Sequence, residues 1–200
     1  NNVCLGFNRL SILDTSPSSN KIFNNNDYSL LFNGEIYNFL YLKKKYLCQH
    51  KLETNTDTEV LFNLLILKKE KIFEELEGMF SIVFLNKKNK TLLLSRDYTG
   101  IKPLYYSVYN HGIFFSSEAW FQYSISNREL DFDKLNFFLK FGFNHYSSTL
   151  IKNVKKVCPS EYIIFNINEK KIEKKKYFSL KKQSEKNDID SDNFQTLIEN

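Results

Sequence analysis

The hydrophobic pattern changes its period along the chain, and this change restricts the fold more than any other feature of the sequence. Strand-like runs lie at Tyr28 to Phe32, Phe80 to Leu85 and Thr91 to Ser95. Between the first two runs the apolar spacing is helical, at Val60, Leu61, Leu64 and Leu65. We therefore expect an α+β protein in which two antiparallel sheets pack together and are flanked by helices.

Further strand and helix patterns fill the rest of the chain. Strand patterns cover Val3 to Leu13, Leu104 to Tyr109, Ile113 to Ser116, Tyr162 to Ile167 and Ile172 to Phe178. Helical patterns cover Tyr37, Leu40, Tyr41 and Leu47, and later Asp133 to Phe141. Before Val60, Thr56 and Glu59 stand three residues apart, as in a capping box that begins a helix.

Composition excludes several classes of function. A chain of 200 residues with 42% hydrophobic residues can bury a core, and no apolar run approaches the roughly 18 residues of a membrane helix. Cys4, Cys48 and Cys158 lack metal-ligand spacing. A small and odd number of cysteines is typical of a reduced, cytoplasmic protein. The net charge is +5, but the lysines are scattered, which favours solvated surface over a nucleic-acid site. We expect no metal site and no contact with membranes or nucleic acids.

Five short motifs follow one another between residues 9 and 106. They are Arg9-Leu10-Ser11-Ile12, Phe32-Asn33-Gly34-Glu35-Ile36-Tyr37-Asn38, Thr56-Asp57-Thr58-Glu59-Val60, Gly78-Met79-Phe80 and Arg96-Asp97-Tyr98-Thr99-Gly100-Ile101-Lys102-Pro103-Leu104-Tyr105-Tyr106. In this order they resemble the glutaminase domain of glutamine-hydrolysing asparagine synthetases, which are class II glutamine amidotransferases. The resemblance continues through Ser117-Glu118, Pro159 and Tyr177-Phe178.

This resemblance implies a fold and a domain organisation. The fold would be the N-terminal-nucleophile αββα sandwich, over residues 1–180. Residues 181–190 are polar and charged and have the composition of a linker. Residues 191–200 would begin the ATP-using synthetase domain. Because the chain does not begin with Met, we expect a processed protein or a fragment that lacks the N-terminal cysteine and the synthetase domain.

The resemblance also assigns roles to individual residues. In the family, an N-terminal cysteine attacks the side-chain amide of glutamine, with its own α-amine as the base. The resulting oxyanion would be bound by the side chain of Asn33 and the backbone N–H of Gly34. Glu35 and Asp57 would hold the α-ammonium group, and Arg9 the α-carboxylate as a bidentate pair. The backbone that would line the glutamine side chain is Leu10, Ser11, Ile12 and Leu13.

Each of these features also has a purely structural interpretation. Asn33-Gly34 is a common tight-turn dipeptide, and Glu35 would then be a solvated turn acid. Asp57 could complement the dipole of the helix that it begins. Cys4 is interpreted as a buried core thiol within the first strand, rather than as a substitute nucleophile.

Some parts of the family pattern are ambiguous or altered. The stretch from Arg96 to Pro103 either faces the ammonia path or forms a structural turn. The chain departs from the usual residues of the family at Phe7-Asn8, at residues 18–22 and at Trp120. These departures leave the expected glutamine contacts intact.

The resemblance implies that the full protein is a ligase. It would hydrolyse glutamine and pass ammonia to aspartate that is activated by ATP, with Mg²⁺, in the synthetase domain; the glutaminase domain itself needs no cofactor. The 200 residues alone would be inactive because the nucleophilic cysteine is absent.

The expected partners are glutamine, the synthetase domain in cis and a second copy in a homodimer. Two alternatives stay open: an amidotransferase for another carboxylate, such as a sugar acid or a peptide, and a degenerate, non-catalytic scaffold.

Overall fold

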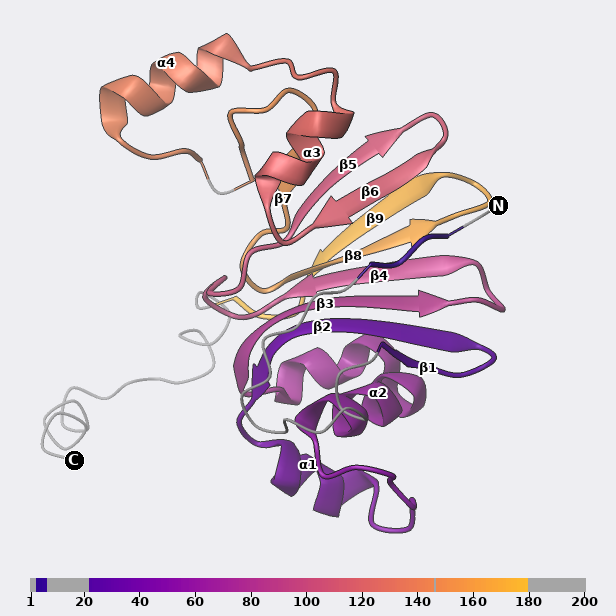
Figure 1. Cartoon of the computed structure of the whole chain (residues 1–200). Helices are drawn as coiled ribbons and strands as arrows, with labels where there is room; N and C mark the ends of the chain where they lie inside the picture. The colour runs from indigo at the N-terminus through magenta and orange to yellow at the C-terminus, as the bar shows by residue number, and fades with distance from the viewer. Residues whose placement is uncertain (1–2, 7–21, 146, 180–200) are drawn as a thin grey trace, which may run out of the picture.

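The computed structural model describes residues 3–6, 22–145 and 147–179 (Figure 1). Its elements in chain order are β1 (Phe23–Asn24), β2 (Tyr28–Ile36), α1 (Phe39–Tyr46), α2 (Asp57–Lys68), the 3₁₀ helix η2 (Lys69–Glu75), β3 (Gly78–Asn86), β4 (Thr91–Arg96), β5 (Tyr105–Tyr109), β6 (Gly112–Ser116), α3 (Ala119–Ile125), α4 (Phe132–Phe141), β7 (Lys155–Lys156), β8 (Glu161–Asn166) and β9 (Lys171–Lys176).

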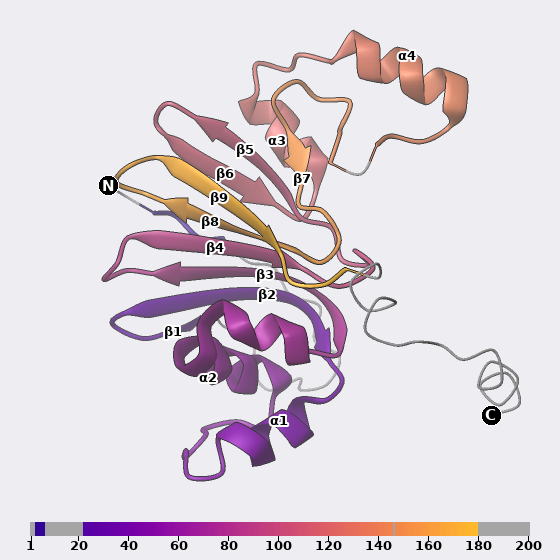
Figure 2. The same cartoon turned by 180° about the vertical axis from the view of Figure 1, so that it is seen from behind.

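These strands form two antiparallel sheets. The larger sheet has the order β1-β2-β3-β4-β8-β9, and the smaller has the order β6-β5-β7. Figures 1 and 2 show α1 and α2 beside β1 and β2, whereas α3 lies next to β5 and β6 at the opposite end of the molecule, with α4 beyond it. The register of β2 against β3 runs without a break from the pair Tyr28–Asn86 to the pair Ile36–Gly78.

Two apolar clusters on the two faces of the larger sheet define the layers. On one face, Phe32 and Phe80 pack against residues of α2 and η2, including Leu64. On the other face, residues of the larger sheet pack against residues of the smaller sheet, such as Leu31 against the cluster that contains Tyr106. The order of layers is thus helices, sheet, sheet and helix, which confirms the expected α+β class and αββα architecture.

The outer helix of this sandwich, α3, is attached to the smaller sheet by a buried polar contact. Gln122 of α3 is almost fully buried, and its Oε1 accepts a hydrogen bond of 2.6 Å from the hydroxyl of Ser107 on β5. A buried amide needs such a partner, so this contact fixes how α3 lies on the sheet.

The helix and strand patterns between residues 28 and 178 are confirmed, with differences at two places, and a third difference lies at the N-terminus. The first is the segment after Tyr37, where the helix forms as α1 but Tyr37, Leu40 and Tyr41 are exposed. Of the expected residues only Leu47, the C-cap, is buried, together with Leu42. The apolar residues that suggested this helix are therefore largely not the ones that anchor it.

The second difference concerns the start of α2. Thr56 is its N-cap, and its hydroxyl accepts a hydrogen bond of 3.3 Å from the N–H of Glu59. The Glu59 carboxylate does not return to the N–H of Thr56, as a full capping box requires. It accepts bonds from the N–H groups of Glu53 and Thr54 instead, at 2.7 and 2.5 Å. Glu59 therefore closes the loop before the helix.

The third difference is at the N-terminus. Residues 3–6 form no strand, and Cys4 is exposed, so its interpretation as a buried core thiol is wrong. The remaining part of the expected first strand, including Arg9, and the proposed linker and second domain at 181–200 lie outside the described residues. No helix in the described part of the chain is long and apolar enough to cross a bilayer.

Candidate active site at the end of β2

The segment from Asn33 to Ile36 is the last part of β2, so its interpretation as a tight turn is wrong. Its residues pair with the first residues of β3, from Asn33 with Ser81 to Ile36 with Gly78. Because side chains alternate along a strand, Asn33 and Glu35 lie on the face of Leu31, which packs in the cluster between the sheets. Asn33 is exposed and Glu35 is half-buried.

The direction of the Gly34 N–H follows from the bonding of its partner Phe80. The N–H of Phe80 donates to Asp97 Oδ2 at 3.2 Å, and its carbonyl accepts from the N–H of Asp97 at 2.9 Å. Both groups therefore face away from β2, and in an antiparallel ladder the opposite residue then also directs its N–H outward. On that side, β1 reaches only Ser29 and Leu30, so no described strand covers the Gly34 N–H.

Asp57 connects the first turn of α2 to the end of β2. Its Oδ2 accepts a hydrogen bond of 3.0 Å from the N–H of Ile36, and only 5% of the residue is exposed. Burial raises the pKa of this carboxyl, the N–H groups of Ile36 and Thr58 oppose the shift, and the negative charge of Glu35 adds to it. Asp57 therefore holds the end of β2 in position, in addition to lying in the first turn of α2.

The carboxylates of Glu35 and Asp57 thus lie near each other at the end of β2, and neither forms an ion pair with a described residue. The Glu35 side chain forms no ion pair with another described residue. Two neighbouring negative charges repel each other, and a cation bound between them would relieve that repulsion. Arg9, Leu10, Ser11, Ile12 and Leu13, the other expected glutamine contacts, lie outside the described residues.

The stretch from Arg96 to Pro103 forms a structural turn around two buried charged residues. Asp97 is fully buried, and its carboxylate accepts bonds from the N–H groups of Phe80, Thr99, Ile101 and Lys102. The Arg96 guanidinium donates to the carbonyls of Gly100, Lys102 and Val157. Asp97 binds Phe80, and Phe80 pairs with Gly34, so this turn positions the strand next to the candidate site.

Asn38 is a positioning residue whose role the sequence did not reveal. Its side-chain amide donates to the carbonyl of Glu75 at 2.8 Å, and its Oδ1 accepts from the N–H of Glu77 at 3.1 Å. These bonds tie the chain after β2 to the segment that enters β3. The only signal in the sequence was the place of Asn38 within the Asn33 to Asn38 motif.

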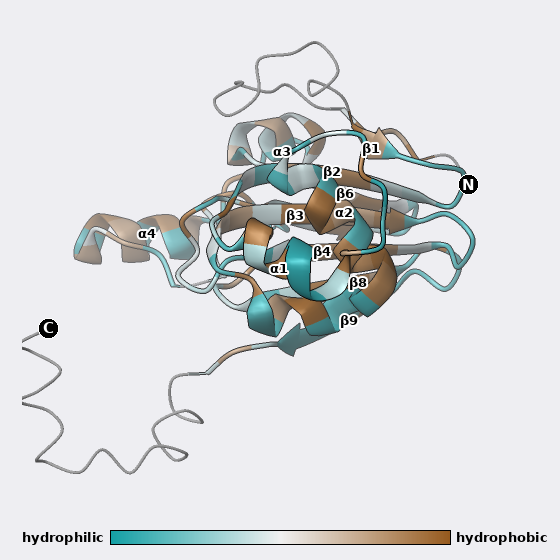
Figure 3. Ribbon diagram, turned by 90° about the horizontal axis from the view of Figure 1, so that it is seen from below, coloured by the Kyte–Doolittle hydropathy of each residue, from teal (hydrophilic) through white to brown (hydrophobic). Residues whose placement is uncertain are grey.

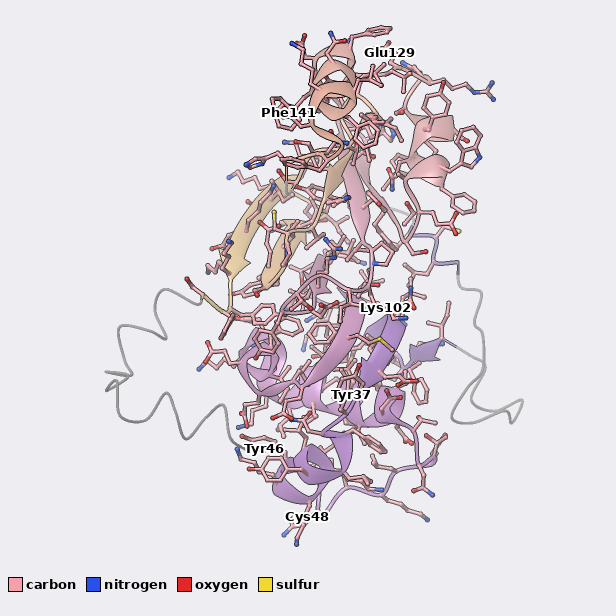
Figure 4. The ribbon with its side chains drawn as sticks, turned by 90° about the vertical axis from the view of Figure 1, so that its left-hand side faces the viewer. Tyr37, Tyr46, Cys48, Lys102, Glu129 and Phe141 are labelled. Atoms are coloured by element: carbon pink, nitrogen blue, oxygen red, sulfur yellow. The ribbon has the colours of Figure 1, made fainter. Side chains whose placement is uncertain are left out.

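The three cysteines differ in their exposure to solvent. Cys4 and Cys48 are exposed, and Figure 4 shows Cys48 beyond α1, away from Tyr37 at the end of β2. Cys158 is half-buried, and burial raises the pKa of its thiol, which disfavours the reactive thiolate.

Comparison with known proteins decides the family. A family model described as "Glutamine amidotransferase domain" matches residues 1–178. The chain belongs to this family. The expected family resemblance is therefore confirmed, and the end of β2 is the candidate active site of a glutamine amidotransferase domain.

The relatives of this amidotransferase domain are longer proteins. "Asparagine synthetase [glutamine-hydrolyzing] 1" of Bacillus subtilis (strain 168) is 37% identical over 161 residues, which are 78% of this chain and 25% of that protein. "Putative asparagine synthetase [glutamine-hydrolyzing] 2" of Methanocaldococcus jannaschii is 29% identical, over 88% of this chain and 38% of that protein. The chain thus spans about a quarter to two fifths of these relatives.

A solved structure supports the fold of the amidotransferase domain. The glutamine phosphoribosylpyrophosphate amidotransferase from B. subtilis, complexed with ADP and GMP, matches with a TM-score of 0.51 and 19% identity. The match covers 79% of this chain and 31% of that chain. At this identity the likeness concerns the sandwich fold alone.

Proposed function

We propose that this domain binds L-glutamine at the end of β2 and releases its amide nitrogen as ammonia. A further region of the longer protein would use that ammonia to convert aspartate to asparagine. The observation that carries the proposal is the arrangement of one outward-facing N–H, at Gly34, beside the acid pair Glu35 and Asp57.

The chemistry of glutamine hydrolysis accounts for this arrangement. The tetrahedral intermediate carries an oxyanion, for which the Asn33 side chain and the Gly34 N–H are the proposed donors. Losing one such donor typically costs a hundred- to a thousandfold in rate. The α-ammonium group would lie at Glu35 and Asp57, where its positive charge offsets the repulsion between the two carboxylates. Arg9 would pair with the α-carboxylate, and the backbone of residues 10–13 would line the side chain of glutamine.

The remaining parts of the reaction belong to the longer protein. We propose an N-terminal cysteine of the longer protein as the nucleophile, rather than Cys4, Cys48 or Cys158; the 200 residues alone would therefore be inactive. ATP and Mg²⁺ would act in a synthetase region in cis, in the cytoplasm. The names of the two relatives favour aspartate as the acceptor over a sugar acid or a peptide.

Calorimetric titration of L-glutamine into the 200-residue chain tests the substrate site. We expect saturable binding that Glu35→Gln and Asp57→Asn each weaken by about 10- to 100-fold, because each removes a charge-assisted contact to the ammonium group. Glu53→Gln, on an exposed residue outside the site, is the matched control and should leave the affinity unchanged. Binding that survives both site variants would contradict the proposed clamp.

Catalysis is tested on the natural, full-length protein. N-terminal sequencing should show cysteine at the mature terminus, and the protein should release ammonia from glutamine. Asn33→Ala should lower this rate at least a hundredfold while glutamine still binds. A mature terminus other than cysteine would favour the scaffold interpretation.

A further inference from the structure

A hollow of about 360 Å³ lies where the 3₁₀ helix η2 meets the end of β9, and we name it the η2–β9 hollow. Glu70 and Glu74 line it from η2, Lys175 lines it from β9, and the rings of Tyr162 and Tyr177 lie between them. The other two residues of the lining are exposed lysines. Figure 3 shows the hydrophilic C-terminal end of β9 at this edge of the larger sheet. The volume is that of a site for a small molecule.

The η2–β9 hollow lies on the other face of the larger sheet from the candidate active site. Tyr162 belongs to the apolar cluster between this sheet and the helices. Lys175 is opposite Tyr162 in the register of β8 and β9, so both side chains share that face. Asn33 and Glu35 lie on the face of Leu31, between the two sheets. A ligand in the hollow therefore does not occupy the proposed glutamine site.

Tyr162 brings a buried polar group without a partner to the hollow. The residue is 8% exposed, and its hydroxyl forms no hydrogen bond with another described residue. Burial raises the pKa of this phenol, the positive charge of Lys175 lowers it and the negative charge of Glu70 raises it, so the hydroxyl lies near both charges. Buried hydroxyl groups normally have a hydrogen-bond partner, and here the hollow has room for one.

Opposite charges face each other across the hollow without joining. Glu70 is half-buried and Glu74 is exposed, and neither carboxylate forms an ion pair with another described residue. Lys175 pairs with Glu173 of its own strand at 2.7 Å. An ammonium group has three donors, so Lys175 keeps donors for a second acceptor. The hollow thus has an acidic side on η2 and a basic side on β9.

The rings beneath these charges form a continuous aromatic surface. The ring of Phe73 lies between those of Tyr162 and Tyr177, with centroid separations of 5.8 and 5.5 Å. The Tyr177 hydroxyl donates to the carbonyl of Arg96 at 2.5 Å, which fixes that ring in place. Such a surface favours an aromatic group of a ligand, because rings stack or pack edge to face.

We propose that the η2–β9 hollow binds an aromatic α-amino acid as its zwitterion. The ammonium group lies at Glu70 and Glu74, and the carboxylate accepts hydrogen bonds from Lys175 and from the Tyr162 hydroxyl. The side chain of the ligand packs on the aromatic surface. An amine or an acid alone leaves one charged side of the hollow without a partner, so the zwitterion binds more tightly than either.

NMR titration of the ¹⁵N-labelled 200-residue chain with L-phenylalanine tests this site. We expect saturable shifts of the amide signals of Glu70, Tyr162 and Lys175, with a millimolar Kd, as is typical for a ligand of this size. Two analogues each lack one charge: 3-phenylpropionate has no ammonium group, and 2-phenylethylamine has no carboxylate. Both should bind at least about fivefold more weakly than L-phenylalanine, because each loses a charge-assisted contact.

Substitutions on the two sides of the hollow should have opposite selectivity. Glu70→Gln should weaken L-phenylalanine at least about fivefold and leave 3-phenylpropionate unchanged. Lys175→Gln should weaken L-phenylalanine similarly and leave 2-phenylethylamine unchanged. Lys171→Gln is the matched control and should have no effect. Lys171 lies on the same strand and face as Lys175 and has a similar ion pair, with Glu169 at 3.4 Å, but it does not line the hollow.

Three results would overturn the proposal. The first is the absence of saturable shifts at the solubility limit of L-phenylalanine. The second is a set of shifts at the end of β2 instead of around the hollow. The third is an equal loss of all three ligands in Glu70→Gln and in Lys175→Gln, with amide spectra that show both variants folded. This inference does not depend on the proposed function.

Discussion

Gly34 and Gly78 lie so close to the opposite strand that neither position has room for a Cβ atom. A Cβ on Gly34 would lie 2.0 Å from the carbonyl oxygen of Met79, and a Cβ on Gly78 would lie 2.1 Å from that of Glu35. Both residues have positive φ angles, 150° and 158°, which other residues rarely adopt. The two motifs that contain these glycines thus form one close contact between β2 and β3. This contact includes Gly34, whose N–H is the candidate oxyanion donor.

Gly34→Ala should strongly destabilise the domain, because the opposing atoms belong to backbone and cannot rotate away. Gly112→Ala is the matched control: Gly112 has a similar φ of 156°, but its Cβ would meet nothing within 4 Å. Urea denaturation should show a loss of about 1–2 kcal/mol for Gly112→Ala from backbone strain. Gly34→Ala should lose at least about 2 kcal/mol more, and equal losses would show that the strand contact can relax.

Asp97 should be the most costly single residue to replace in the turn beside β3. Asp97→Ala leaves the N–H groups of Phe80, Ile101 and Lys102 without their acceptor, and the buried Arg96 guanidinium without a nearby negative charge. We expect a loss of about 3–5 kcal/mol in the free energy of unfolding, or no folded protein. Asp27→Ala, at an exposed loop residue, should change this free energy by less than about 0.5 kcal/mol.

The sequence predicted the elements well where local patterns and tertiary structure agree. The helix after Thr56 and the strands around residues 86–91 formed as expected because cap, turn and apolar period all indicate the same structure. Asn33-Gly34 suggested that the strand ends after Phe32, because the turn preference of this dipeptide depends only on the local sequence. The strand continues through it because Gly34 and Gly78 permit the close contact with β3.

The candidate site was predicted from motifs, and its supporting contacts were not. Nothing local to Asp57 indicates that its carboxylate binds the N–H of Ile36, since the two residues meet only when α2 packs on the sheet. The same holds for Asp97, which directly follows β4, and Phe80, which lies in β3. Such long-range polar contacts depend on register, which composition and periodicity do not fix.

The N-cap of α2 should contribute measurably to stability. Thr56→Ala removes the acceptor of the Glu59 N–H, and this should cost about 1 kcal/mol of unfolding free energy. Thr56→Ser retains the hydroxyl and is the control, with an expected change of a few tenths of a kcal/mol. A loss that is equal in both variants would mean that the threonine methyl group, and not the cap, stabilises this turn.

Asp57 should make stability decrease as pH rises. Burial, together with the charge of Glu35, raises the pKa of Asp57 above its ordinary value of 3.8. The folded state therefore holds this proton more tightly than the unfolded state does. Its contribution to stability is fully present below pH 3.8 and is lost as the pH rises through the folded pKa.

Asp57→Asn removes this titration while its Oδ1 can still accept the bond from Ile36. In urea denaturation at a series of pH values, the variant should gain stability relative to the wild type as the pH rises from about 3 to 7. Saturating glutamine should reduce this gain, because a bound ammonium group favours the carboxylate of the wild type. Asp133→Asn, at an exposed residue of α4, should show no such trend. A gain that shrinks with rising pH would mean that hydrogen bonds to Asp57 outweigh its burial, and that its folded pKa is lowered.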